Sequence, residues 1–244
     1  MSANPTFHSR IRVATLAIGT ELTDGQVLDR NSKWLSEAVL ETLRFECEII
    51  EHRCVPDDRE KIQAGLRDLC RQAELVLVTG GLGPTSDDFT REEIATFSGA
   101  PLEWSEDAWA WVQERLKQRG AMVSENQKQQ CYFPKGASLL KNSQGTAYGF
   151  WLPQERSKGP VDGAVETVLI SMPGPPTEIR AVWAEGLKDR LLGWAMAWRK
   201  QVTGQGGAPQ APSLHLVRTM GIGEGALASG VAEIVAEVQA RFPD

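Results

Sequence analysis

Three short runs of apolar and largely β-branched residues each end in a glycine, and a helical pattern follows each of them. The runs are IRVATLAIG (11–19), LVLVTG (75–80) and ETVLISMPG (166–174). Runs of this length and composition are typical of strands that are buried inside a sheet. Because strands and helices alternate along the chain at this spacing, we predict an α/β fold with a mostly parallel sheet and helices on both faces.

Polar residues that favour helix starts precede most of the helical patterns. The expected starts are Asn31 or Ser32, Asp57 with Glu60, Thr90 with Glu93, and Ser105. The helices that begin there are expected to reach about Leu43, Cys70, Phe97 and Arg119. The other elements expected are a strand over 47–55, a polar helix over 124–131, two short strands within 138–153, and a helix over about 176–192.

Composition divides the chain into four parts. Residues 1–10 are expected to form a flexible tail, and residues 11–198 the main domain. Residues 199–213 are rich in Gly, Pro and Gln, which is typical of a linker or loop. Residues 214–241 repeat the strand-to-glycine pattern, and we expect them to form a strand–helix unit that packs with the main domain.

The composition argues against several classes of function. The net charge of −6 disfavours binding to nucleic acid. No apolar run approaches the roughly 20 residues that span a bilayer, and the N-terminus lacks the apolar core of a signal peptide. The four cysteines show no CxxC spacing, and Cys54 and Cys70 are expected to be buried free thiols. A cytoplasmic protein that does not contact a membrane is therefore expected.

Glycine-rich loops follow the predicted strands. They are 19–25, 79–90, 142–149, 173–178 and 221–225. Glycine allows backbone N–H groups to approach a ligand closely, and a helix that starts nearby adds a partial positive charge. Because parallel strands end at one edge of a sheet, we expect these loops to meet there and to favour a phosphate or carboxylate. The chain has no GxxxxGK[ST] motif and no GxGxxG in its first strand–helix turn, which disfavours a P-loop enzyme and a dinucleotide dehydrogenase.

Three acids stand at the strand ends of three of these loops. Glu21, Asp88 and Glu178 each follow a different predicted strand. One interpretation of Asp88 and Glu178 is structural, since acids near a helix start stabilise the helix dipole. The other is a divalent-metal site, because Mg²⁺ and Mn²⁺ prefer oxygen ligands and substrate phosphates. Adjacent side chains rarely point the same way, so only one of Asp87 and Asp88 is expected to act.

Several ordered motifs resemble the N-terminal domain of the CinA (competence/damage-inducible protein A) family, within the wider molybdopterin-binding group of MogA, MoaB and MoeA. The motifs are GTEL (19–22) with DRNS (29–32), GGLGPTSDDFTRE (80–92), NSQGTAYGF (142–150), PGPPTE (173–178) and GIGE (221–224). The resemblance implies a three-layer αβα sandwich. It also implies a metal-dependent ADP-ribose pyrophosphatase activity that uses Mg²⁺, Mn²⁺ or Co²⁺.

The resemblance also suggests roles for individual residues. Asp88 would be the metal ligand or general base, with Asp87 and Glu178 as further catalytic candidates and Glu178 as a second metal ligand. The residues expected to contact the substrate are Glu21, Gly80, Gly81, Gly83, Thr85, Asn142, Gly145, Thr146, Gly174 and Pro175. Lys141 is a further candidate for a phosphate contact.

The sequence departs from the family pattern in three ways. Gly225 stands where the family has a serine, 154–164 looks like an enlarged hairpin, and the chain ends at Asp244, about where an amidase domain would begin. No amidase activity is therefore expected.

Three hypotheses remain open: a hydrolase of nucleotide diphosphates, a pterin-binding module of molybdenum cofactor biosynthesis, and a non-catalytic nucleotide-binding domain that works with a separate amidase. A homo-oligomer is also expected, through Trp183, Trp194 and Trp198, unless these are core residues.

Overall fold

The computed structural model describes residues 10–154 and 167–203, together with single residues between 221 and 240. The chain divides into two compact units, residues 1–209 and 210–244. In the second unit the described residues Gly225, Ala226, Ala228, Val231, Ala232, Ala236 and Ala240 are helical. The expected hairpin over 154–164, apart from its first residue, and the expected strand of the second unit lie almost wholly outside the described residues. All that follows concerns the first unit.

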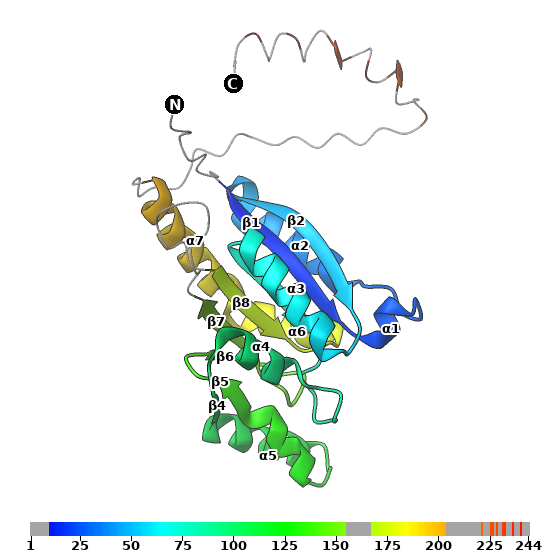
Figure 1. Cartoon of the computed structure of the whole chain (residues 1–244), viewed down its shortest axis with the longest axis vertical. Coiled ribbons are helices and arrows are strands. Elements are labelled where there is room, and N and C mark those ends of the chain that lie inside the picture. The colour runs from blue at the N-terminus through cyan, green and yellow to red at the C-terminus, as the bar shows by residue number, and fades with distance from the viewer. Residues whose placement is uncertain are drawn as a thin grey trace. The chain divides into compact units, whose positions relative to one another are not determined.

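A six-stranded sheet forms the centre of this unit, in the order β2-β1-β3-β8-β7-β6 (Figure 1). Four strands are parallel: β1 (Ile11–Ile18), β2 (Cys47–Val55), β3 (Leu75–Thr79) and β8 (Thr167–Met172). Strand β7 (Gly149–Gln154) is antiparallel to β8, and β6 (Ser138–Leu140) is antiparallel to β7. The prediction of a mostly parallel sheet is confirmed. Because β6 therefore runs in the direction of β8, the loop after β6 lies at the edge where the parallel strands end.

Helices cover both faces of the sheet, since the inner parallel strands β1, β3 and β8 are buried on both sides. Along β3, Leu75 and Leu77 join a core with α2 (Asn31–Leu43), α6 (Pro176–Val182) and α7 (Lys188–Thr203). Val76 and Val78 point to the other face and join a core with α3 (Arg59–Gln72), α4 (Thr90–Ser98) and α5 (Glu106–Gln118). These three layers confirm the expected αβα sandwich.

A small antiparallel pair extends the second helical layer beyond the main sheet. Strand β4 (Leu102–Trp104) pairs with β5 (Tyr132–Pro134), and α5 lies against them (Figure 1). The polar segment 124–131 is helical as expected, but it forms a 3-10 helix, η2 (Glu125–Cys131). This helix joins α5 to β5 and lies close to two of the glycine loops.

Helix starts differ in detail from the predicted ones. Helix α5 begins as expected, with Ser105 accepting from the N–H of Ala108. At α2, however, neither predicted residue caps the helix; Asp29 Oδ1 accepts from the N–H groups of both Asn31 and Ser32. At α3 the cap is Asp58, whereas Asp57 accepts from Thr20. Helix α4 has no side-chain cap. An aspartate that stands two residues before a helix can thus replace the expected cap.

Three further expectations were wrong. The loop after β1 contains a short helix, α1 (Thr20–Thr23). The expected single helix over about 176–192 is instead two helices: the chain kinks within η3 (Trp183–Leu187), where Glu185 and Gly186 leave helical geometry and Gly186 has φ +138°, and α7 then runs to Thr203. The first residues of the expected linker are thus helical, and 204–213 lie outside the described residues. Cys54 is exposed, whereas Cys70 is buried as expected.

The tryptophans of this last helical segment are not free to form an interface. Trp183 and Trp198 are buried within the unit. Trp194 is half-buried and packs edge-on against Trp151, with ring centroids 6.0 Å apart. The alternative interpretation, that these are core residues, is therefore the one the structure supports.

Candidate functional site

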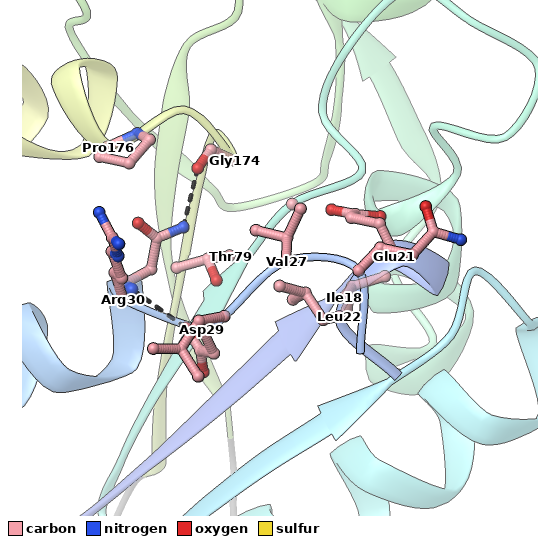
Figure 2. A pocket seen from close by; sticks show the side chains of 13 residues that line it. Ile18, Glu21, Leu22, Val27, Asp29, Arg30, Thr79, Gly174 and Pro176 are labelled. Carbon is pink, nitrogen blue, oxygen red and sulfur yellow. Dashed lines mark hydrogen bonds between the residues drawn. The ribbon is translucent and has the colours of Figure 1, made fainter. Parts of the chain in front are cut away.

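A cleft of about 480 Å³ opens where β1 and β3 end. Its lining comes from the end of β1, the segment that joins β1 to α2, the end of β3 and the loop after β8 (Figure 2). From β1 the chain proceeds to β2 on one side, and from β3 it proceeds towards β8 on the other. This is the topological switch point of the sheet, which is where open α/β sheets bind their ligands.

Backbone, rather than side chains, forms the floor of this cleft. Gly80 has φ +97°, and a Cβ at this position would overlap the carbonyl oxygen of Ile18. Its N–H donates to the carbonyl of Met172 at 3.1 Å. A Cβ at Gly174 would lie 3.7 Å from the Cα of Gly80. The ends of β1, β3 and β8 therefore meet with only backbone between them, and no other residue type fits at position 80 without displacing a strand.

The start of α2 forms one wall. Asp29 Oδ1 accepts from the N–H groups of Asn31 and Ser32, each at 3.0 Å. The side-chain amide of Asn31 donates to the carbonyl of Gly174 at 2.8 Å, which ties α2 to the loop after β8 (Figure 2). Because Asp29 already engages the first helical N–H groups, these groups are not the obvious donors for an anion in the cleft.

Two charged side chains of the lining remain without a partner. The guanidinium of Arg30 and the carboxylate of Glu21 make no hydrogen bond or ion pair with any residue that the structure describes. Figure 2 shows them at opposite ends of the drawn group, with Val27 and Thr79 between them. The cleft therefore has a cationic end and an anionic end.

Of the residues predicted to contact a substrate, Glu21, Gly80 and Gly174 line this cleft. Pro176 lines it in place of the predicted Pro175, which precedes α6 and is exposed. The remaining predicted residues form two other groups.

The first of these groups is the 80–90 loop, between β3 and α4. Asp88 Oδ2 accepts from the N–H of Thr85 at 2.9 Å and also from its hydroxyl. Gly83 lies so close that a Cβ there would overlap Asp88 Oδ2. Asp88 is half-buried and Asp87 is exposed. Asp88 thus closes the loop on itself, which is a structural task.

Helix α4 begins at Thr90 as expected, but the expected capping by Thr90 and Glu93 was wrong. The hydroxyl of Thr90 is buried beside Gly81 and has no hydrogen-bond partner among the described residues. The carboxylate of Glu93 pairs with Arg59 at 2.5 Å and accepts from Gln63 at 2.7 Å. Neither side chain caps α4.

Two side chains outside the loop itself, those of Arg91 and Gln129, hold the 80–90 loop in place. The buried guanidinium of Arg91 donates to the carbonyls of Leu82 at 2.7 Å and Gly83 at 3.0 Å. Burial lowers the pKa of Arg91 to about 10, so it remains a cation at neutral pH. Gln129 of η2 donates to the carbonyl of Thr85 at 2.6 Å. The loop is therefore tied both to the start of α4 and to η2.

The second group surrounds Asn142, which is fully buried. Its amide donates to the carbonyl of Ala147 at 2.9 Å and to Glu178 Oε2 at 2.7 Å, and its oxygen accepts from the N–H groups of Gln144 at 3.1 Å and Gly145 at 3.0 Å. A Cβ at Gly145 would overlap Glu178 Oε2. Glu178 therefore shapes this loop.

The two groups are linked through η2. Thr146 donates to Gln130 Oε1 at 2.8 Å, and the preceding residue, Gln129, holds the 80–90 loop. Lys141, the predicted phosphate contact, is exposed and lies 5.0 Å from the ring centroid of Trp111.

The three predicted acids do not form a metal centre by themselves. Across residues 10–154 and 167–203, no three His, Cys, Asp or Glu side chains are grouped so that they could hold a metal ion. Glu21 lines the cleft, Asp88 binds Thr85, and Glu178 binds Asn142. The side chains present thus do not fit a resident metal held by protein ligands alone.

The residues that the sequence-based predictions missed are Arg30, Asn31, Arg91 and Gln129. Arg30 and Asn31 lie in the DRNS motif, directly at the start of the predicted helix, and that position was the available signal. Arg91 lies in the GGLGPTSDDFTRE motif, which was likewise the available signal, whereas no local pattern distinguishes Gln129 from surface residues of a polar helix.

The fold and the cleft define a class, that of α/β proteins with a cleft at the switch point of a mostly parallel sheet. Residues 14–193 match the family described as "Probable molybdopterin binding domain". The chain is 34% identical over 229 residues to a CinA-like protein of Synechococcus sp. (strain CC9311), which covers 93% of this chain and 48% of that protein. The chain belongs to this molybdopterin-binding domain family, on its CinA-like branch.

Solved structures agree with this placement. The crystal structure of the protein CinA from Thermoplasma acidophilum has a TM-score of 0.61 and 25% identity, and covers 74% of this chain and 98% of that one. A protein of Corynebacterium diphtheriae, named for molybdenum cofactor biosynthesis, has a TM-score of 0.50 at 13% identity, with 79% and 98% covered, and shows the fold alone. The chain spans about half the length of the curated relatives it matches. Among the described residues, no helix has the length and apolar character needed to span a bilayer.

Proposed function

We propose that this domain binds a small phosphorylated ring compound, a pterin or a nucleotide, in the cleft between β1 and β3. The observation that carries the proposal is the unpaired guanidinium of Arg30 beside a floor made of backbone. A guanidinium that has no protein partner and lies at the switch point of the sheet is suited to pair with an anionic group of a ligand. Membership of a family described as molybdopterin binding supports a pterin as one such ligand.

Arg30, rather than the helix start, is the group expected to hold the anion. The first N–H groups of α2 are engaged by Asp29, so they add little to anion binding. The guanidinium offers a planar set of donors that matches phosphate geometry. Gly80 contributes by leaving room, because it places no side chain between the phosphate and the strand ends.

Calorimetric titration with ADP, GDP and a pterin monophosphate tests the proposal. We expect binding by at least one of these ligands, and Arg30→Met is expected to weaken it by about 10-fold or more, the loss of a charge-assisted pair. Arg67→Met, on the exposed side of α3, is the control and should bind as the unaltered chain does. If none of these ligands binds, or if both variants bind equally well, the proposal is wrong.

The 80–90 loop supports a second candidate, hydrolysis of a nucleotide diphosphate such as ADP-ribose. Asp88 is held in a fixed position by Thr85 through Oδ2, while its Oδ1 makes no hydrogen bond with a described residue. A fixed carboxylate with one free oxygen is suited to accept a proton or to join a metal–phosphate unit.

Chromatographic detection of AMP from ADP-ribose tests this candidate, with Mg²⁺, Mn²⁺ or Co²⁺ added in turn. Asp88→Asn preserves the size of the side chain and is expected to lower turnover by about 100-fold or more if the carboxylate acts as a base. Asp24→Asn, an exposed acid outside the lining of the cleft, is the control. Binding of ADP-ribose without any release of AMP would exclude hydrolysis and leave the binding function standing.

A further inference from the structure

The anionic end of the cleft is built around Glu21 of α1. Its carboxylate has no partner among the described residues and folds back over the backbone, so that a Cβ at Gly19 would lie 2.6 Å from Oε1. The backbone carbonyl of Glu21 accepts from the N–H groups of Gln26 at 3.0 Å and Val27 at 3.1 Å. This turn fixes the backbone from which the carboxylate projects and brings the segment after α1 to the cleft.

Apolar side chains lie next to this carboxylate. Val27 is 52% exposed and Leu28 is 75% exposed, and both line the cleft together with Leu22 and Ile18. Exposed apolar residues at the wall of a cleft are a common means of covering a flat ring. Arg30 lies at the opposite end of the drawn group, so an anionic group bound there leaves the ring of the same ligand near Glu21 (Figure 2).

We propose that Glu21 selects the ring of the ligand by accepting two hydrogen bonds from a ring N–H and the adjacent exocyclic amino group. This inference rests on the proposed binding function. The two oxygens of a carboxylate match two parallel N–H donors. Guanine and pterin share such an edge, the 2-amino-4-oxo-pyrimidine. Adenine instead places a ring acceptor beside its amino group, and that acceptor would face the carboxylate.

The inference separates the two candidate functions in chemical terms. A guanine nucleotide or a pterin phosphate gains two charge-assisted hydrogen bonds at Glu21, whereas ADP-ribose can donate one at most, from its amino group, and places its ring acceptor against the carboxylate. A bidentate contact to a base edge discriminates by about 5- to 150-fold, and because Glu21 is exposed we expect about 10-fold.

Titration with three nucleoside diphosphates tests the role of Glu21. GDP carries the full edge, IDP lacks only the 2-amino group, and ADP carries the opposite pattern. We expect GDP to bind about 10-fold more tightly than IDP and ADP. Glu21→Gln, which exchanges one acceptor for a donor, should bring the affinities for GDP and IDP to within about threefold of each other. Asp24→Asn, the matched acid one turn further on, should preserve the preference for GDP.

The same titrations distinguish a pterin from a guanine nucleotide as the ligand. They also separate a failure of the role assigned to Glu21 from a failure of the proposed binding function. A pterin monophosphate that binds more tightly than GDP identifies a pterin as the ligand; the reverse order identifies a guanine nucleotide. If the unaltered chain binds ADP or IDP as tightly as GDP, or if Glu21→Gln weakens all three equally, the role assigned to Glu21 is wrong while the binding function stands. If none of the ligands binds, both are wrong.

Discussion

Replacing Asn142 by aspartate tests how strongly Glu178 and the 142–147 loop depend on each other. The substitution keeps the shape of the side chain and the acceptor for the N–H groups of Gln144 and Gly145. It removes the donor to Ala147 and places a carboxylate oxygen where the amide nitrogen stands, 2.7 Å from Glu178 Oε2. Because position 142 is fully buried, the introduced carboxylate would be shielded from water and would stand beside the carboxylate of the half-buried Glu178.

The expected magnitude follows from the pKa of the introduced carboxyl. Burial beside a second carboxylate raises the pKa of such a group by up to about 3–5 units. At about 1.4 kcal/mol per unit, the loss of stability at pH about 7 is about 4 kcal/mol, because only the roughly three pH units above the unfolded pKa of about 4 contribute at that pH. The total stability of a domain is only about 5–15 kcal/mol, so the variant should lose a large part of its stability at pH about 7.

The pH dependence has a definite sign. In the folded variant the introduced carboxyl keeps its proton at a pH where the unfolded chain, with a pKa of about 4, has already released it. The cost is therefore small below pH about 4 and grows as the pH rises towards the folded-state value. Urea unfolding of the variant and the unaltered chain, at pH about 5 and about 7, measures the difference.

Gln144→Glu provides the matched control, because it adds the same charge to the same loop at an exposed position. Its cost should stay within about 0.5 kcal/mol and should not change with pH. A cost for Asn142→Asp that is independent of pH, or no larger than that of the control, would refute the argument that Asn142 and Glu178 form one buried polar pair.

Two other substitutions test the residues that shape the cleft and the 80–90 loop. Gly80→Ala should lower the free energy of unfolding by about 3 kcal/mol or more, because the new Cβ would overlap a carbonyl of β1. The control, Gly99→Ala, has φ +63° and no atom within 4 Å of the new Cβ, so urea unfolding should show a loss of only about 1–2 kcal/mol. Arg91→Met keeps an apolar stem but removes the donors that Arg91 gives to the carbonyls of Leu82 and Gly83. It should cost about 3 kcal/mol, against less than about 0.5 for Arg67→Met. Equal costs within either pair of variants would contradict the structure.

The sequence was most informative about the strands that are buried on both faces. Strands β1, β3 and β8 are continuous apolar runs, so their positions and their parallel pairing could be predicted. The shared edge of these strands also explains why Glu21, Gly80 and Gly174 were correctly expected to lie near one another. The course of the chain around Gly186 was not predictable, since the apolar pattern before and after the kink continues as one helical period.

The roles of the acids were less accessible from the sequence. Sequence rules for helix starts choose the capping residue by its position just before the apolar pattern of the helix. Asp29, however, accepts from N–H groups of α2 from outside the helix, and Asp88 accepts from Thr85 instead of from the helix that follows it. Which hydrogen bond an acid makes depends on φ and ψ of a few loop residues, and these are set by distant groups such as Arg91. Position along the chain therefore indicated where acids gather but not what each acid binds.

The adjacent glutamines of η2 have a consequence for how the loops respond to ligands. Gln129 holds the 80–90 loop and Gln130 holds Thr146, so one turn of 3-10 helix restrains two loops that follow different strands. Ordering either loop restricts η2 and thereby lowers the entropy cost of ordering the other. Two ligands, or two halves of one ligand, that contact different loops would then bind with positive cooperativity, even without any change in the average structure.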